Sequence, residues 1–478
     1  MTESMGRWNR RSVMAMGAGV LAAPSFAMSS PASELPPAAL DRVREMMRDR
    51  RIPAAGIAVV HNGVTMMATG LGMASLPFEV PANEKTLFHL GSVGKQVTAA
   101  LVFELAEAGA IDLDGPLGRY ARGLPRAFTT IPVSALLSHT GGVPDYEGLP
   151  GFEADRPIAR EAFLAGISAV PIDFYPGRAW AYSNTGYVLL GYLLADVTGK
   201  SYRDLVTERL LRRADLPDAR VDDAGAVIAR RAEPYVLENN TTRHAVGMSS
   251  DYSGSADGGV LMSARDAVQW EQALQAGPIP SSATVARLMR PALMSSGRNA
   301  AYGAGWFTDE VNGRLVQYHS GSVPGFLTFA WRAPLTRTAV TVMVNIESGP
   351  AGRFIEEACL TLAEVVAPGS TPLSLVPIQD DAPDVTEQAL ALLARGGRAL
   401  DPGLFTPEIS ALMNGKAAGG VLPFNLGADT TGVEWSLVGR HDEPGGQVRR
   451  YRLTRKGRAR HVSFAYAPDG RIYRFRNL

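Results

Sequence analysis

Strand-forming segments open and close a region of this chain that runs from about residue 37 to residue 367, and helix-forming segments fill its middle. Short apolar runs lie at 56–67 and again at 315–345, whereas apolar residues recur at helical spacing between 92 and 276. Asn62-Gly63 joins two of the first apolar runs, which indicates a β-hairpin because both residues tolerate a positive φ. We therefore predict an α+β fold in which both ends of the region build one antiparallel sheet and a helical domain is inserted between them.

The chain of 478 residues is longer than a single hydrophobic core usually organises, which favours a second domain. Proline is frequent over 368–383, and this segment is typical of a linker. Beyond the linker, 384–478 holds a helical pattern followed by strand-like segments, which predicts a small C-terminal α+β domain. The predicted strands are Val433–Val438, Val448–Leu453, His461–Tyr466 and Ile472–Phe475.

The first residues of the chain have the pattern of an export signal. Arg10 and Arg11 precede an apolar run over 13–23, and the small residues of Ser25-Phe26-Ala27 follow. This order is that of a twin-arginine signal peptide, which we predict over 1–27. The alternative is a retained amphipathic or disordered start. The apolar run is too short to cross a bilayer, so we expect no permanent membrane anchor and a periplasmic or secreted protein.

Charge and composition argue against several classes of protein. A formal net charge of +0 provides no basic field for nucleic acid, so we expect no nucleic-acid partner. Cys359 is the only cysteine, which rules out an internal disulfide and a cysteine metal cluster. The histidines are scattered without the i, i+4 pairing of a helical zinc site. We therefore expect neither a metal nor a cofactor.

The first chemical motif is Ser92-Val93-Gly94-Lys95 at the head of an apolar helical segment. Positions i and i+3 of a helix share a face, so the ammonium of Lys95 should reach the hydroxyl of Ser92. A serine hydroxyl needs such a neighbour to become a nucleophile, and a helix N-terminus supplies a backbone N–H for developing negative charge. In isolation, Ser92 could equally be a helix cap and Lys95 a solvated surface residue.

The second motif is Tyr182-Ser183-Asn184. A tyrosine flanked by cations can be held partly as phenolate, and Tyr182 would then exchange protons with the serine and the leaving group. Asn184 offers a donor and an acceptor to a substrate amide. Without the other motifs, a core tyrosine and a turn asparagine explain the same residues.

The third motif is His319-Ser320-Gly321-Ser322, at the predicted end of a strand. The missing side chain of Gly321 would let a substrate backbone approach the strand. The N–H of Ser322 would complete an oxyanion hole with that of Ser92. A further histidine, His139, stands in a glycine turn, and we interpret it as a structural residue that holds local backbone.

Together these motifs resemble those of the serine β-lactamase-like family, which includes class C β-lactamases, DD-peptidases, D-aminopeptidases and related esterases. The resemblance covers about 37–366 and places the family's Ser-x-x-Lys at Ser92 and Lys95, its Tyr-x-Asn at Tyr182 and Asn184, and its Lys/His-Thr/Ser-Gly at His319 to Gly321. Flanking phrases also match, notably Leu136 to Gly142, Pro176 to Tyr187 and Asp257-Gly258-Gly259. The resemblance implies a β-lactamase/transpeptidase-like fold, and a smaller likeness relates the C-terminal domain to NTF2-like domains.

The resemblance also implies an acyl-enzyme mechanism. Ser92 would attack an amide or ester, and Lys95 and Tyr182 would handle the proton, either of them being the base. Class C β-lactamases carry lysine where this chain has His319, and histidine is only partly charged near neutral pH. The departure favours a D-amino-acid peptidase, a DD-carboxypeptidase-like enzyme or an esterase, acting on small molecules, peptides or peptidoglycan fragments. The alternatives are a β-lactamase and a catalytically silent penicillin-recognising sensor.

Overall fold

The computed structural model describes residues 35–276, 281–288, 290–395, 401–414, 432–455 and 457–477. The predicted signal peptide over 1–27 lies outside the described residues. Within the described ranges, no helix combines the length and the apolar character needed to cross a membrane.

One eight-stranded antiparallel sheet is the central element, with the strand order β3-β2-β1-β13-β12-β11-β10-β9. Its members are β1 (Ala54–His61), β2 (Val64–Ser75), β3 (Val80–Pro81), β9 (Tyr302–Gly303), β10 (Trp306–Val311), β11 (Arg314–Val323), β12 (Phe326–Ala333) and β13 (Thr338–Val344). The pairing of β1 with β13 joins the two ends of the region, as predicted. Asn62 and Gly63 both have positive φ, 52° and 78°, and turn β1 into β2 as the expected hairpin.

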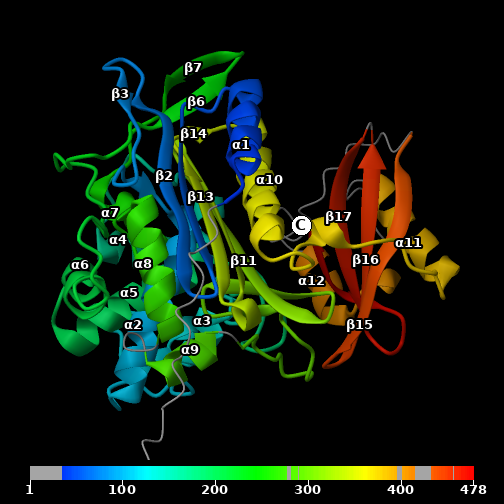
Figure 1. Ribbon diagram of the computed structural model, residues 1–478. Helices are drawn as coiled ribbons and strands as arrows, with labels where there is room; N and C mark the ends of the chain where they lie inside the picture. The colour runs from blue at the N-terminus through cyan, green and yellow to red at the C-terminus, as the bar shows by residue number, and fades with distance from the viewer. Residues whose placement is uncertain are drawn as a thin grey trace, which may run out of the picture. The chain divides into compact units, whose positions relative to one another are not determined.

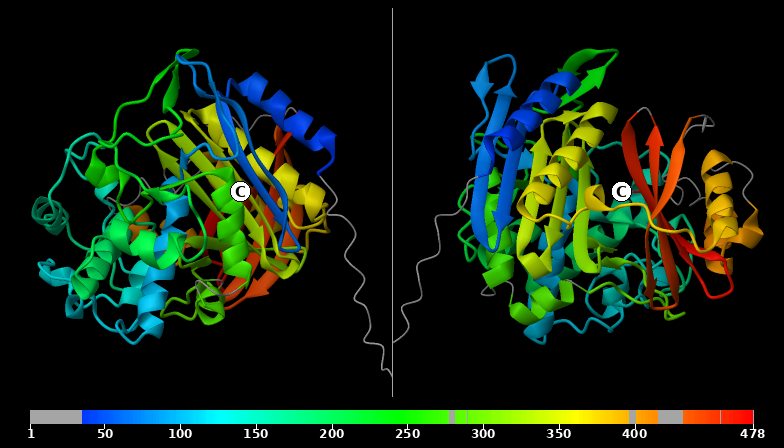
Figure 2. Two further views of the ribbon diagram at one scale, coloured as in Figure 1. Left: turned by 60° about the vertical axis from the view of Figure 1, so that its left-hand side comes forward. Right: turned by 45° about the vertical axis from the view of Figure 1, so that its right-hand side comes forward.

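Helices cover both faces of this sheet (Figures 1 and 2). On one face, α1 (Pro37–Arg50) packs against α10 (Gly349–Val366), and α10 packs on β12 and β13. On the other face, α8 (Ala264–Ala276) packs on β1 and β2. Apolar side chains at helical spacing, such as Val43 and Met46 of α1, form the buried stripes that make this packing favourable.

The inserted helical domain lies between β3 and β9 in the sequence and surrounds α2 (Lys95–Glu107). Its other helical segments are α3 (Val133–Leu137), α4 (Arg160–Ser168), α5 (Asn184–Thr198), α6 (Tyr202–Leu205), a π-helical turn (Val206–Leu211), α7 (Ser250–Ser253) and α9 (Ser282–Leu288). Two three-stranded sheets, β4-β8-β5 and β14-β6-β7, border it, and β14 of the second sheet comes from the chain after β13. Their strands are β4 (Phe88–His89), β5 (Arg220–Val221), β6 (Tyr235–Glu238), β7 (Thr241–His244), β8 (Val260–Met262) and β14 (Ile346–Glu347).

The described residues of the C-terminal part, 383–395, 401–414, 432–455 and 457–477, include two α-helices and a four-stranded antiparallel meander. The helices are α11 (Pro383–Arg395) and α12 (Pro407–Asn414), and the strands are β15 (Glu434–Glu443), β16 (Gly446–Arg455), β17 (Arg458–Tyr466) and β18 (Ile472–Asn477). The predicted linker begins as a well-packed turn, because Glu364 of α10 accepts hydrogen bonds from Gly369 and Thr371. The NTF2-like assignment of the C-terminal part stays a prediction.

Two predicted element boundaries are wrong: the helix begins three residues later than predicted and the strand ends four residues later. α2 begins at Lys95, and Ser92 lies in the 3₁₀ turn Gly91–Gly94 that leads into it. His319 lies inside β11, which continues to Val323, and not at the end of a strand. The strand runs on because residues 321–323 still pair with 326–328 of β12.

Candidate active site

Ser92 and Lys95 meet as the motif predicts. The ammonium Nζ of Lys95 donates to Ser92 Oγ at 2.9 Å, to Asn184 Oδ1 at 2.6 Å and to the carbonyl of Asp257 at 2.6 Å. These are as many acceptors as an ammonium has protons. Ser92 remains partly accessible, whereas Lys95 is fully buried. The side chain of Lys95 therefore acts only on neighbours within the site.

Burial lowers the pKa of Lys95 to about 8, although the negative charges of Asp257, Asp145 and Glu147 oppose the shift. A lysine with this pKa is neutral in about one molecule in ten at pH 7 and in about half of the molecules at pH 8. The neutral amine has a lone pair that can accept the proton of Ser92 across the 2.9 Å contact. The geometry and the pKa together suit Lys95 to the role of a general base.

Tyr182 stands on a loop that His139 holds in place. Nδ1 of His139 accepts the N–H of Ser183 at 3.1 Å, and the His139 carbonyl accepts the N–H of Ala181 at 3.1 Å. The imidazole ring lies 4.3 Å from the ring of Tyr182, centroid to centroid. Burial lowers the pKa of His139 well below its usual value, so the ring is neutral. The geometry supports the interpretation of His139 as a structural residue.

The phenol of Tyr182 is protonated, so the expectation of a partial phenolate is wrong. Burial raises its pKa well above 10, and the carboxylates of Asp145 and Asp257 raise it further, while the nearby Ser92 side chain acts in the opposite direction. Lys95 Nζ lies 4.9 Å from the ring centroid. The buried phenol oxygen makes no hydrogen bond of strict geometry among the described residues, but the Ser92 side chain is close enough to it to lower its pKa by hydrogen bonding. The hydroxyl is therefore placed to exchange a proton with Ser92 or to donate to a bound molecule.

Glycines bring three backbone segments together around Ser92. A Cβ on Gly321 would lie 2.0 Å from the carbonyl oxygen of Leu90, and a Cβ on Gly91 would lie 2.7 Å from the nitrogen of Ser322. Gly91 also has a φ of 52°, in the left-handed region that favours glycine. The backbones of residues 90–92 and 321–322 are therefore in close contact. The N–H groups of Ser92 and Ser322 both lie at this contact, as the two donors of an oxyanion hole require.

His89 fixes the turn that carries Ser92, and the motif analysis missed it. Its Nδ1 accepts the N–H of Gly91 at 3.0 Å, while its Nε2 lies 2.9 Å from the carbonyl oxygen of Ser253. The carbonyl can only accept, so the proton is on Nε2 and the ring is the neutral tautomer. Burial lowers the pKa of His89 accordingly.

His319 is also neutral, which corrects the expectation of a partly charged side chain. It is 2% exposed, and burial together with the charge of Lys95 lowers its pKa to about 3. Nδ1 lies 2.6 Å from the carbonyl oxygen of Ser320, so it carries the proton, and Nε2 accepts from the hydroxyl of Tyr302 at 3.0 Å. Both nitrogens are therefore occupied within the protein. His319 is held by Tyr302 and by the carbonyl of Ser320, and it presents no positive charge to a substrate.

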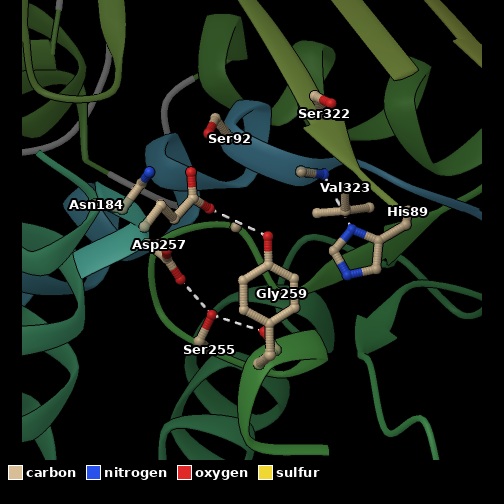
Figure 3. A pocket seen from close by; sticks show the side chains of 12 residues that line it. His89, Ser92, Asn184, Ser255, Asp257, Gly259, Ser322 and Val323 are labelled. Carbon is tan, nitrogen blue, oxygen red and sulfur yellow. Dashed lines mark hydrogen bonds between the residues drawn. The ribbon is translucent and has the colours of Figure 1, made fainter. Parts of the chain in front are cut away.

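The pocket beside Ser92 is acidic (Figure 3). In this view Ser92 lies between Asn184 and Ser322, and Asp257 and Ser255 line the opposite side. Glu147 also lines the pocket and accepts a hydrogen bond from the hydroxyl of Tyr252 at 3.1 Å. Glu147 is an exposed residue, but the protein packed around its carboxylate and the like charges of Asp145 and Asp257 raise its pKa to about 7. No lysine or arginine is among the residues that line this pocket.

The residues predicted from the sequence divide into those in contact with Lys95, those beside the Ser92 turn and those that touch neither. Hydrogen bonds join Ser92, Lys95 and Asn184, and the ring of Tyr182 lies against Lys95. Gly321 and Ser322 flank the Ser92 turn, whereas His319 lies behind it and Ser320 is exposed on β11. Motif reasoning assigned no role to His89, Glu147, Asp257 or Tyr302. Asp257 was visible in a family-like phrase, but neither Glu147 nor Tyr302 belongs to a chemical motif.

A nucleophile, an adjacent amine and a backbone N–H pair are the components of a serine hydrolase. Residues 40–359 match the family model described as Beta-lactamase. The chain therefore belongs to the β-lactamase family and is a serine hydrolase of that family.

Relatives and solved structures place the chain among enzymes and penicillin-binding proteins. It is 28% identical to penicillin-binding protein 4* of Bacillus subtilis, over 63% of this chain and 71% of that protein. It is 25% identical to a D-aminopeptidase of Brucella anthropi, over 64% of this chain but only 59% of that protein. The octameric penicillin-binding protein homologue of Pyrococcus abyssi shares the fold over 91% of this chain and 94% of its own, with a TM-score of 0.59 and 19% identity.

Proposed function

We propose that Ser92 forms an acyl-enzyme, with Lys95 as the base that accepts its proton. In support, Lys95 Nζ contacts Ser92 Oγ directly and has a pKa of about 8. The protonated phenol of Tyr182, which lies within hydrogen-bonding reach of the Ser92 side chain, would donate to the departing amine or alcohol. The N–H groups of Ser92 and Ser322 would bind the oxyanion, and Asn184 would bind the substrate amide while it orients Lys95.

We further propose that the substrate carries a free ammonium group next to the scissile carbonyl, as in an amide, ester or peptide of a D-amino acid. The observation that carries this proposal is Glu147, whose carboxylate lines the pocket beside Ser92 with Asp145 and Asp257 behind it. A cluster of acids favours a cation and disfavours an anion at the same place. The likeness to a D-aminopeptidase agrees with this choice.

The same electrostatics argue against substrates that are held by a carboxylate. Penicillins and the C-terminal ends of peptides both carry one, and binding it requires a positive charge close to Ser92. His319 is neutral with a pKa of about 3, and the pocket lining contains no lysine or arginine. We therefore consider the functions of a DD-carboxypeptidase and of a β-lactamase less well supported than that of an amine-recognising hydrolase.

Glu147→Gln tests the proposal because it keeps the shape of the side chain and removes its charge. For D-alanine p-nitroanilide, kcat/KM is expected to fall roughly 10- to 100-fold, the range of a charge-assisted hydrogen bond. For p-nitrophenyl acetate, which has no amine, kcat/KM at pH 9 is expected to change less than twofold. In the wild type, KM for the anilide should fall as pH rises toward about 7, where the Glu147 carboxylate forms, and should rise again above about pH 8, where the α-amine of the substrate loses its proton.

The matched control is Glu153→Gln, which removes the charge of an exposed glutamate that pairs with Arg156. It should leave kcat/KM for both substrates unchanged. If Glu147→Gln alters the two substrates equally, Glu147 does not bind the amine and the proposed substrate class is wrong.

We also propose that the protein is exported through the twin-arginine route and cleaved near Ala27, on the pattern of Arg10-Arg11 and the apolar run that follows. Replacing both arginines with lysine should leave an uncleaved precursor in the cytoplasm, visible as a larger band after cell fractionation. Unchanged export of that variant would exclude this route.

A further inference from the structure

Arg476, on the last strand of the chain, is a buried cation far in sequence from Ser92. It is 8% exposed, and burial lowers its pKa. Its guanidinium donates to the carbonyl of Thr308 and to the carbonyl of Ala300, each at 3.2 Å. These carbonyls belong to the catalytic domain, so a side chain of β18 reaches across to β10 and to the segment just before β9.

Arg476 also lies against two aromatic rings of the catalytic domain. Its guanidinium carbon is 4.7 Å from the ring centroid of Phe307 and 5.9 Å from that of Trp180. Such contacts are favourable cation–π interactions when water is excluded. Trp180 precedes Tyr182 by two residues, and Phe307 follows Trp306 at the start of β10.

The two rings contact Tyr302 and His319, which in turn contact Tyr182. The ring of Phe307 is 5.1 Å from that of His319 and 4.9 Å from that of Tyr302, between centroids. The ring of Trp180 lies 6.1 Å from that of Tyr302. Tyr182 in turn contacts His319, at 6.0 Å. We call Trp180, Tyr302, Phe307 and His319 the aromatic wall, because Tyr182 rests against it.

The backbone before Tyr302 is itself strained. Ala301 has a φ of 49°, which a non-glycine residue adopts only when its surroundings hold it there. Arg476 binds the carbonyl of the preceding residue, Ala300, and so fixes one side of this turn. The hydroxyl of Tyr302 then donates to Nε2 of His319 at 3.0 Å.

Other arginines of the same interface have acidic partners. Arg474 forms an ion pair with Glu443 at 2.7 Å, and Arg450 pairs with Asp309. Among the residues that the structure describes, no carboxylate lies within ion-pair distance of Arg476. The carboxylates of Asp309 and Glu443 act on Arg476 only from beyond ion-pair distance, so burial of this guanidinium is less well compensated than burial of Arg450 or Arg474.

We propose that Arg476 is a positioning residue of the active site, and that the C-terminal sheet is part of the catalytic apparatus. By holding two carbonyls and two rings at once, Arg476 sets the position of the aromatic wall and hence of the Tyr182 hydroxyl relative to Ser92. The inference rests on the serine hydrolase site and not on the proposed recognition of an amine.

The test replaces Arg476 with methionine in the full-length protein and measures hydrolysis of an ester of a simple alcohol, such as phenethyl acetate, whose leaving alkoxide needs the proton that Tyr182 would donate. Because a small displacement of a catalytic group can cost up to about 100-fold, kcat per fluorophosphonate-labelled Ser92 is expected to fall at least tenfold. KM should change less than twofold. Activity is expected to rise with pH up to about 8 as Lys95 loses its proton, and this rise should be unchanged in the variant. Arg476 is not among the charges that shift the pKa of Lys95. Lysine at position 476 keeps the charge but cannot hold both carbonyls, so Arg476→Lys should show most of the same loss.

Arg474→Met is the matched control, since Arg474 also donates to this loop, at the carbonyl of Asn299, but has no contact with the aromatic wall. It should lower the melting temperature while kcat per labelled site stays within twofold of wild type. The proposal fails if Arg476→Met, or Arg476→Lys where the methionine variant does not fold, retains kcat per labelled site. It also fails if Arg474→Met loses as much.

Discussion

Replacing Ser92 with alanine is expected to lower kcat/KM for p-nitrophenyl acetate roughly 10⁴-fold or more, the scale on which a nucleophile is lost from a hydrolase. The expectation follows from the local chemistry, because the hydroxyl of Ser92 lies both 2.9 Å from Lys95 Nζ and next to the glycine-lined backbone contact. In wild type, a fluorophosphonate should attach to Ser92 and add one label per chain. Peptide mapping by mass spectrometry checks the site of attachment.

The control is Ser168→Ala, which removes the hydroxyl of an exposed serine near the end of α4. Activity and labelling of this variant should equal those of wild type. A label on any serine other than Ser92, or full activity in Ser92→Ala, would contradict the acyl-enzyme proposal.

The sequence predicted the parts of the site that depend on local geometry. Ser92 and Lys95 are three residues apart across a 3₁₀ turn and the first residue of α2, and residues i and i+3 also share a face in 3₁₀ geometry, so their contact follows from local spacing. The order of the three motifs along the chain then indicated the fold, and this fold brings Tyr182 and Gly321 close to Ser92 and Lys95. The α+β class and the antiparallel sheet closed by both ends of the region were confirmed for the same reason, since hydrophobic periodicity reports the elements directly.

Charge states were not predictable from the motifs. Tyr182 was expected to be partly ionised because cations were expected beside it, and His319 was expected to be partly charged because the reference pKa of histidine was the only guide. Burial dominates both shifts, and burial arises from segments that are distant in the sequence, such as Tyr302 against His319. Glu147 was missed for the same reason. Its role depends on Tyr252 and Asp257, which reach the pocket from a loop more than a hundred residues further along.

The contribution of the C-terminal sheet was hidden for a different reason. Alternating arginines on β18 are what an exposed edge of a sheet would also carry, so the pattern does not separate Arg474 from Arg476. Only the packing of Arg476 on Trp180 and Phe307 does so. A sequence-based division into a catalytic domain and an appendage thus separates residues that lie in one interface.

Replacing Lys95 with methionine is expected to lower kcat/KM for p-nitrophenyl acetate roughly 10²- to 10⁴-fold, the contribution of a well-placed general base. In wild type, activity should rise with pH up to about 8, because the neutral amine that accepts the serine proton forms as Lys95 loses its own proton. This limb should vanish in Lys95→Met. Glu147→Gln should move the limb to lower pH, because the Glu147 carboxylate is one of the charges that raise the pKa of Lys95.

Lys200→Met provides the control, since it removes an exposed lysine that pairs with Glu208. Its pH profile should match that of wild type, and the melting temperature of each variant shows that it is folded. If the limb near 8 persists in Lys95→Met, the titrating group is another residue, and the phenol of Tyr182 becomes the candidate base despite its raised pKa. If the limb vanishes but Tyr182→Phe abolishes it as well, the two groups titrate as a coupled pair and the base cannot be assigned to Lys95 alone.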